Sequence, residues 1–346
     1  MILSFDGFPL IIGWELTLAC NLRCKHCGSS AGQARPGELT REEALKLCDQ
    51  FPALLVQEVD FTGGEPLLRS DWADIAAHLR DLGITTEILS NGIALEPEVI
   101  SKMKEVGISG VGISLDGLEP THDHIRDQKG SFQHVIAGIK RVLEADIPLT
   151  IITTVNALNI DQLPEIGELL KSLGVERWRL QPIVPFGRVK GSKELVLNEQ
   201  TYLQLEEFAN SWRALEGEME LICTDGLNYF NEINRPEYPW RGCPAGLATC
   251  SITSDGKVKG CLSLPDEIIE GDLRKNDLWD IWFDPKSFAY TRQFSAEKIG
   301  QNCVSCEKID ECRGGCSSKS YGNSGGFNND PFCTHGIEIR RGKTGA

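Results

Sequence analysis

The sequence lacks any apolar run that approaches the roughly 20 residues needed to span a bilayer. Its first segment, 1–18, has no cationic stretch and contains Asp6 and Glu15, so it does not read as a secretion signal. Basic side chains are also scarce, with 35 Lys and Arg against 50 Asp and Glu and a net charge of −15. Because nucleic-acid backbones are bound by clustered Lys and Arg, we expect neither nucleic acid nor a membrane as partner, and a cytoplasmic location.

Cysteine is sparse over most of the chain and dense at two places. Of the 13 cysteines, three lie near the start, eight lie in the range 243–333, and two stand alone. In a reducing compartment, clustered thiols are metal ligands more often than disulfides. The two isolated cysteines, Cys48 and Cys223, are expected to be buried small hydrophobic residues.

Residues 11–182 alternate short apolar runs with amphipathic segments of helical period. Thr40 followed by Glu43 matches a capping box at the start of the first helix, and Gly83 suits a helix end. The β-branched runs are Ile11–Leu18, Val59–Thr62, Thr86–Ser90, Val111–Leu115, Leu149–Val155 and Arg177–Pro182. Six such units predict an α/β fold with a parallel sheet, either open or closed into an incomplete barrel, with ligands at the carboxyl ends of the strands.

Every distinctive motif of this region follows one of the predicted strands. Taken singly, glycines and prolines at these places form βα turns. Because the carboxyl ends of parallel strands meet at one rim, we expect the four motifs to surround one site. In chain order they are Cys20-Asn-Leu-Arg-Cys24-Lys-His-Cys27, Gly63-Gly64-Glu65-Pro66, Asn91-Gly92 and Ser114-Leu-Asp116-Gly117.

The C-x3-C-x2-C loop can hold three irons of a cubane cluster and leave the fourth iron without a protein ligand. An open metal position is typical of catalytic sites, whereas closed coordination serves structure. A zinc site is the alternative. Tetrahedral zinc needs a fourth ligand, and His26, placed between two of the cysteines, is awkward for that role.

The cysteine loop and the Gly-Gly-Glu-Pro motif together resemble the radical S-adenosylmethionine (SAM) superfamily. The resemblance implies that SAM chelates the open iron of a catalytic [4Fe-4S] cluster held by Cys20, Cys24 and Cys27. It implies contacts to the methionyl amine of SAM from Gly63, Gly64 and Glu65. It assigns the ribose and carboxylate of SAM to Ser114, Asp116 and Arg126. A guanidinium pairs well with a carboxylate, and an ordinary surface arginine is the alternative for Arg126.

The later cysteines resemble the SPASM extension of that superfamily, which carries two auxiliary four-iron clusters. The resemblance assigns one cluster to Cys243, Cys250, Cys261 and Cys316. It assigns the other to Cys303, Cys306, Cys312 and Cys333. Alternating residues around Asp255-Gly256 predict a β-hairpin between Cys250 and Cys261. Two structural zinc sites are the alternative for these eight cysteines.

We therefore predict a partial (β/α)6 TIM-like barrel with a small cysteine-rich C-terminal SPASM domain that carries a β-hairpin. The expected boundaries are 10–215 for the radical SAM core, 216–242 for a bridging segment, 243–335 for the SPASM domain and 336–346 for a flexible tail. The implied cofactors are SAM and three [4Fe-4S] clusters, one catalytic and two auxiliary.

The resemblance implies reductive cleavage of SAM to a 5′-deoxyadenosyl radical, with electrons from a flavodoxin or ferredoxin, and hydrogen abstraction from a substrate. Because SPASM enzymes commonly modify ribosomally made peptides, we predict a precursor peptide that is crosslinked, oxidised or rearranged. Few residues flank the cysteine-bearing range, so a separate protein is expected to recognise the leader peptide. Leu262 after Cys261 replaces the aspartate of sulfatase-maturing members, which counts against formylglycine formation.

Three alternatives stay open at this point. The chain could be a SPASM enzyme that acts on a tetrapyrrole or another small molecule, an iron–sulfur electron carrier, or a zinc-stabilised scaffold. The sequence singles out no catalytic acid or base.

Overall fold

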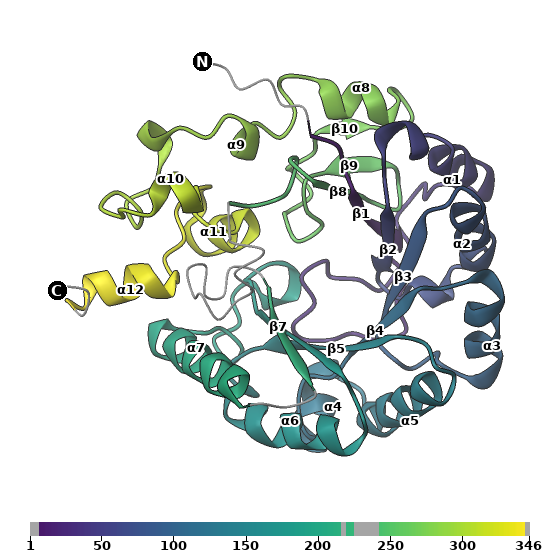
Figure 1. Cartoon of the computed structure of the whole chain (residues 1–346), viewed down its shortest axis with the longest axis horizontal. Coiled ribbons are helices and arrows are strands. Elements are labelled where there is room, and N and C mark those ends of the chain that lie inside the picture. The colour runs from purple at the N-terminus through teal and green to yellow at the C-terminus, as the bar shows by residue number, and fades with distance from the viewer. Residues whose placement is uncertain (1–6, 216–218, 225–241, 343–346) are drawn as a thin grey trace.

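The computed structural model describes residues 7–215, 219–224 and 242–342. One ten-stranded sheet runs through these residues in the order β10-β9-β8-β1-β2-β3-β4-β5-β6-β7. Figure 1 shows this sheet curving into an incomplete barrel with helices on its outer side. The predicted α/β fold is confirmed, and of the two arrangements left open the sheet adopts the barrel-like one.

Seven neighbouring strands of the sheet run parallel to one another. The first six match the predicted apolar runs to within one or two residues, the usual uncertainty of strand ends. The seventh lies in the segment expected to be a bridge, most of which falls outside the described residues. The seven strands are β1 (Ile11–Thr17), β2 (Glu58–Gly63), β3 (Thr85–Ser90), β4 (Gly110–Ser114), β5 (Leu149–Val155), β6 (Arg177–Pro182) and β7 (Glu220–Cys223).

Capping residues mark ends of the helices that cover the barrel. Thr40 and Glu43 form the predicted capping box, and Gly83 has a φ of 80° just beyond its helix. These helices are α1 (Arg41–Cys48), α2 (Trp72–Asp81), α3 (Pro97–Val106), α4 (Glu119–Arg126), α5 (Ser131–Glu144), α6 (Leu163–Ser172) and α7 (Glu199–Ala214). Single 3-10 turns lie at 52–54, 66–68, 160–162, 187–189 and 296–298.

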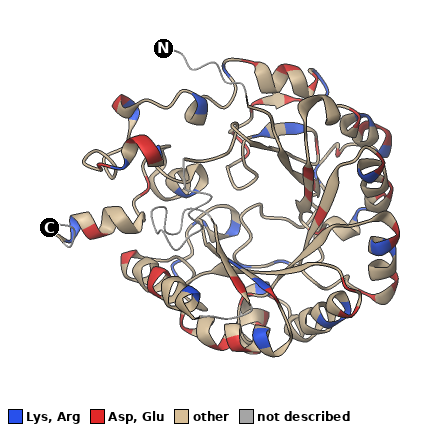
Figure 2. Cartoon of the chain, in the orientation of Figure 1, with Lys and Arg blue, Asp and Glu red and all other residues tan. Residues whose placement is uncertain are grey.

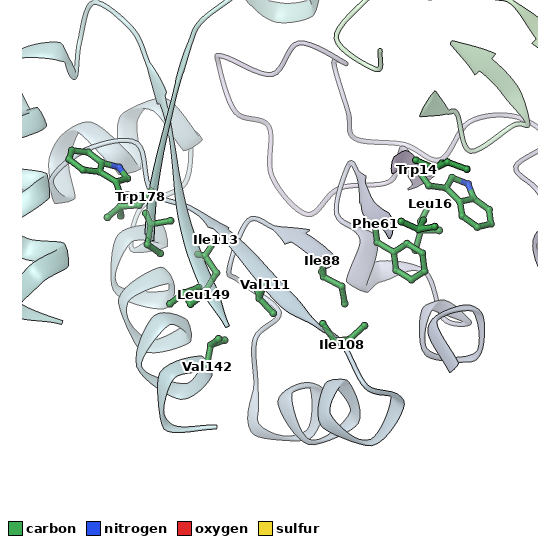
Figure 3. Close-up of a cluster of buried hydrophobic side chains, with 14 of the residues drawn as sticks. Trp14, Leu16, Phe61, Ile88, Ile108, Val111, Ile113, Val142, Leu149 and Trp178 are labelled. Atoms are coloured by element: carbon green, nitrogen blue, oxygen red, sulfur yellow. The ribbon is translucent and has the colours of Figure 1, made fainter. Parts of the chain in front are cut away.

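The core lies between the sheet and these helices. Figure 3 shows Trp14, Phe61 and Ile88 directed to the helix side, and all three are fully buried. On β6, Trp178 and Leu180 point the same way, because successive side chains of a strand alternate between its two faces. The intervening strand positions therefore point into the barrel, where the functional site lies.

The C-terminal region extends the barrel sheet. Its hairpin is formed by β8 (Thr249–Ile252) and β9 (Lys257–Lys259), which are antiparallel as predicted, with β10 (Gly271–Asp272) at the edge. Strand β8 pairs in parallel with β1, and Cys250 lies opposite Ile12. The remaining helices are α8 (Leu278–Phe283), α9 (Ala289–Arg292), α10 (Ile309–Cys312), α11 (Ser317–Ser324) and α12 (Thr334–Arg340).

Residues 336–342 do not form the expected flexible tail. Residues 336–340 belong to helix α12, in which Ile337 is fully buried, and 341–342 form the turn that follows it. Arg340 Nη2 donates to Glu199 Oε1 at 2.9 Å, so helix α12 is attached to α7. A buried apolar side chain together with this ion pair gives the segment a reason to be ordered.

The surface agrees with the composition. Figure 2 shows acidic and basic residues interspersed along the outer helices. Of the helices in the described ranges, none combines the length and apolar character that a membrane span requires.

Candidate active site

A cavity of about 340 Å³ opens at the carboxyl ends of the parallel strands. Its wall is built from the loops after β1 to β4, from β5 and β6, and from Leu262 and Ser263 after the hairpin. Several residues predicted to hold the cluster and SAM lie in this wall, namely Cys20, Cys24, Cys27, Gly63, Gly64, Ser114 and Arg126. Glu65 and Asp116, both fully buried, lie outside it.

Each sulfur of the cysteine loop faces a hydrogen-bond donor. Donors to sulfur stabilise thiolates and are typical of residues around iron–sulfur clusters. They are Leu22 N to Cys20 Sγ at 3.4 Å, Ala31 N to Cys27 Sγ at 3.4 Å, and Arg126 Nη1 to Cys24 Sγ at 3.8 Å. Among the described residues that line the cavity there is no fourth cysteine. The donor set therefore fits a cluster with three protein ligands and one open iron.

Gly63 and Gly64 are required by the close approach of two loops. An added Cβ at Gly64 would overlap the carbonyl oxygens of Ala19 and Leu18, and one at Gly63 would overlap that of Thr17. Gly63 also has a φ of 134°, a conformation that favours glycine. The motif thus brings the end of β2 against the start of the cysteine loop.

Glu65 holds the loop after β3. Its carboxylate accepts hydrogen bonds from Ser90 Oγ at 3.0 Å, Asn91 N at 2.8 Å and Leu67 N at 3.3 Å. Burial raises its pKa to about 7 although these donors act in the opposite direction. Asn91 Nδ2 in turn lies 3.8 Å from Cys20 Sγ. Gly63 and Gly64 line the cavity whereas Glu65 does not, and the contacts of all three residues to SAM stay predictions.

Asp116 is the centre of a buried charge network. Its Oδ2 lies 2.5 Å from Arg126 Nη2 and 2.9 Å from His26 Nε2, and its Oδ1 accepts from Thr154 N at 2.9 Å. Burial opposes ionisation of Asp116, but Arg126 and His26 outweigh it and hold its pKa well below the usual range. Arg126 is 6% exposed, so its alternative interpretation as a surface arginine is wrong. Asp116 orients Arg126, and Arg126 and Ser114 face the cavity.

Two arginines on the β6 side of the cavity were not predicted. Arg188 Nε donates to Cys24 O at 2.7 Å and its Nη1 donates to Ala31 O at 3.0 Å, which attaches β6 to the cysteine loop. Arg179 lines the cavity, and its buried Nε has no hydrogen-bond partner among the described residues. The alternation Trp178-Arg179-Leu180 was the signal for an inward Arg179, whereas Arg188 had none.

The first predicted auxiliary set lies around helix α9. Thr291 Oγ1 donates to Ala245 O at 2.7 Å and Arg292 Nε donates to Gly246 O at 2.6 Å, which attaches the helix to the loop after Cys243. Arg292 also acts on the pKa of Cys250, which burial raises to about 12. Cys316 packs in one buried cluster with Cys312 and Cys333 of the second set, so its assignment to the first set stays a prediction.

The cysteines of the second predicted set influence one another electrostatically. Burial raises the pKa of Cys312, and the charges of Cys333, Cys303 and Cys306 raise it further, in that order. Sequence reasoning missed His335, whose ligand atom lies within 4.8 Å of those of Cys306 and Glu307. Its position two residues after Cys333 was the available signal.

The isolated cysteines take no part in these sites. Cys48 is fully buried in the barrel core, as predicted. Cys223 is half-buried and packs at the edge of the same core.

Comparison with known proteins agrees with this geometry. Residues 14–170 match the Radical SAM superfamily model, and residues 243–314 match SPASM, an iron–sulfur cluster-binding domain. The chain is 30% identical to the AdoMet-dependent heme synthase of Methanosarcina barkeri, over 96% of this chain and 98% of that protein. It is 36% identical to the Fe-coproporphyrin III synthase of the same organism, over 95% and 88%.

Two further similarities involve peptides. The mycofactocin maturase MftC of Mycolicibacterium smegmatis is 28% identical over 95% of this chain and 83% of its own. The solved structure of native anSMEcpe with bound AdoMet and Kp18Cys peptide has a TM-score of 0.77 at 16% identity and covers 96% of both chains, which shows a shared fold. The chain belongs to the radical SAM superfamily and is a radical SAM enzyme with a SPASM domain. SAM and [4Fe-4S] clusters are the cofactors expected of these domains, and a total of three clusters stays a prediction.

Proposed function

We propose that this radical SAM enzyme modifies a carboxylate-bearing tetrapyrrole. The proposal rests mainly on the similarity over nearly the whole length to a heme synthase and an Fe-coproporphyrin III synthase. From the sequence alone a tetrapyrrole was the alternative substrate. With these similarities we now prefer it to a peptide substrate. Since the chain is a radical SAM enzyme, the electron-carrier and zinc-scaffold alternatives are set aside.

In this proposal the cavity wall divides into a SAM side and a substrate side. Cys20, Cys24 and Cys27 hold the catalytic cluster, and together with SAM that cluster supplies a 5′-deoxyadenosyl radical. Glu65 and Asp116 are positioning residues. Each is fully buried and holds a neighbouring residue that lines the cavity. On the SAM side, Gly63, Gly64, Ser114 and Arg126 contact the methionyl amine, the ribose and the carboxylate of SAM.

The substrate side is lined by residues that suit a flat anion. Haem and coproporphyrin are planar macrocycles with propionate side chains, and guanidinium groups pair well with carboxylates. In a chain of net charge −15, Arg179 and Arg188 both line this wall. Among the described residues, Arg188 donates to the neutral carbonyls of Cys24 and Ala31, which do not neutralise its charge. Apolar surface for the macrocycle comes from Ile152, Val184, Phe186 and Leu262.

The test uses anaerobically reconstituted protein with a strong reductant and SAM. We expect iron-coproporphyrin III or a related iron tetrapyrrole to stimulate formation of 5′-deoxyadenosine and to change mass, and Cys24→Ala to abolish both. Arg179→Gln is expected to raise KM for the tetrapyrrole by at least tenfold while basal SAM cleavage is retained. Stimulation by peptides alone, with no binding of tetrapyrroles, would refute the proposal.

Peptide maturation is the second candidate, and the match to a mycofactocin maturase favours it. In that case the substrate is a precursor peptide delivered by a separate leader-recognition protein. Formylglycine formation is disfavoured within this candidate. The first carboxylate after Cys261, that of Asp266, is held by Arg35 Nη1 at 2.7 Å and Lys259 Nζ at 3.2 Å. In either case a flavodoxin or ferredoxin is the proposed electron donor.

A further inference from the structure

Tyr290 carries a buried hydroxyl that needs a partner. Its Oη has no hydrogen-bond partner among the described residues. A buried hydroxyl left unpaired destabilises the fold, and the great majority of such groups in native proteins are bonded. An orphaned hydroxyl beside predicted metal ligands therefore points to a group that binds there.

The position of this hydroxyl is closely defined. The ring of Tyr290 stacks on that of Phe327, with centroids 4.3 Å apart and an interplanar angle of 10°. The next residue, Thr291, is tied to Ala245 O at 2.7 Å. A Cβ added to Gly260 would overlap Tyr290 Oη, so glycine lets the hydroxyl lie against the backbone directly before Cys261.

The electrostatics place two predicted ligands near the ring. Burial raises the pKa of Tyr290, and the charges of Cys243, Glu270 and Cys261 raise it further. A tyrosine hydroxyl can donate one hydrogen bond, so Oη of Tyr290 can serve as a donor to a neighbouring sulfur.

We propose that Tyr290 donates a hydrogen bond from its hydroxyl to a sulfur of the auxiliary cluster held by Cys243 and Cys261, and so raises the reduction potential of that cluster. The proposal rests on the auxiliary cluster that the resemblance to SPASM domains assigns to Cys243, Cys250, Cys261 and Cys316. A donor favours the reduced state because the reduced cluster carries more negative charge on its sulfurs. Leu262 and Ser263, directly after Cys261, line the active-site cavity. The tuned cluster is therefore the auxiliary cluster attached to the cavity wall.

Tyr290→Phe in the full reconstituted chain tests this, because it removes one oxygen and keeps the stacked ring. We expect the potential of one auxiliary cluster to fall, measured by redox titration with EPR detection, while the other clusters are unchanged. A tenfold change in the ratio of oxidised to reduced cluster corresponds to about 59 mV. Tyr321→Phe is the matched control, since the ring of Tyr321 packs against the same Phe327, with ring centroids 5.0 Å apart.

Gly260→Ala supplies a second variant, because its Cβ displaces the hydroxyl without changing the tyrosine. We expect a shift in the same direction. If both variants load their clusters and leave every potential unchanged, the hydrogen bond does not exist. If the wild-type chain carries iron at the amino-terminal site alone, the auxiliary assignment itself fails, and this inference with it. Loss of the auxiliary spectrum in Tyr290→Phe together with a lowered potential in Gly260→Ala would support the proposal.

Discussion

Lys319 and Asp330 form an ion pair that is almost wholly removed from water. Their side chains are each 1% exposed, and Nζ lies 3.1 Å from Oδ2. Lys319 Nζ also donates to Phe332 O at 3.0 Å and lies 4.4 Å from the centre of the Tyr202 ring on α7. Asp330 Oδ1 accepts from Phe332 N at 2.9 Å. The pair thus joins α11, the segment before Cys333 and the outer helix of the barrel.

Lys319→Met keeps the length of the side chain and removes its charge. It removes the ammonium group that lies 3.1 Å from the buried carboxylate of Asp330. Removing one partner of a buried pair costs about 3–5 kcal/mol, whereas replacing both partners is often nearly neutral. We therefore expect Lys319→Met to lower the free energy of unfolding by roughly 3 kcal/mol or more. The double variant with Asp330→Asn is expected to lose less than the single one.

Urea unfolding of the reconstituted protein under anaerobic conditions, followed by tryptophan fluorescence, measures these differences. The control is Lys102→Met, because Lys102 pairs with Glu105 on the surface of α3 with side chains 44% and 67% exposed. Such a pair contributes about 0.3–0.5 kcal/mol. The reasoning is refuted if Lys319→Met costs no more than Lys102→Met, or if the two changes at Lys319 and Asp330 simply add.

Two other predictions follow from the site and the barrel interior. Gly64→Ala is expected to abolish SAM binding in calorimetry, since the added Cβ overlaps Ala19 O, whereas Gly83→Ala, which meets no atom within 4 Å, is expected to retain it; equal affinities would contradict the site. Burial, with Glu58 and Glu87, raises the pKa of Asp60 from 3.8 to about 7. The folded state then binds the extra proton, so wild-type stability falls as pH rises between these values, by at most about 1.4 kcal/mol per pKa unit. Asp60→Asn is expected to melt above wild type at about pH 8 and to lose this advantage towards about pH 5. A constant difference in Tm would contradict the assigned pKa.

The parts of the fold that local chemistry encodes were predictable. The six barrel strands were visible as β-branched runs, and the Thr40 capping box uses only neighbouring residues. The cysteine loop was recognisable for the same reason, because Cys20, Cys24 and Cys27 lie close together in the chain. The hairpin after Cys250 also follows from a turn signal at Gly256, whose φ is 83°.

Features that depend on distant residues were not predictable. Nothing local to Asp116 shows that His26, from another loop, lies 2.9 Å away. Glu65 was expected to contact SAM, which stays a prediction, but nothing in the surrounding sequence shows that its carboxylate accepts from Ser90 Oγ and Asn91 N after β3. Likewise, Ile337 acquires its role only when α12 packs on α7, so a short polar C-terminus read as a tail.

The pairing of β8 with β1 explains how the cysteine-dense region can serve the barrel cavity. Both strands belong to one sheet, so Cys250, a predicted auxiliary ligand, lies on a strand that pairs with the strand leading into the cysteine loop. Glu15 on β1 reinforces this junction, since its Oε1 accepts from Ser254 Oγ at 2.9 Å and from Arg35 Nε at 2.6 Å. Arg35 also holds Asp266, just beyond the two residues that line the cavity after Cys261. The position of the hairpin relative to the cavity is therefore fixed by the sheet and by the ion pair between Glu15 and Arg35.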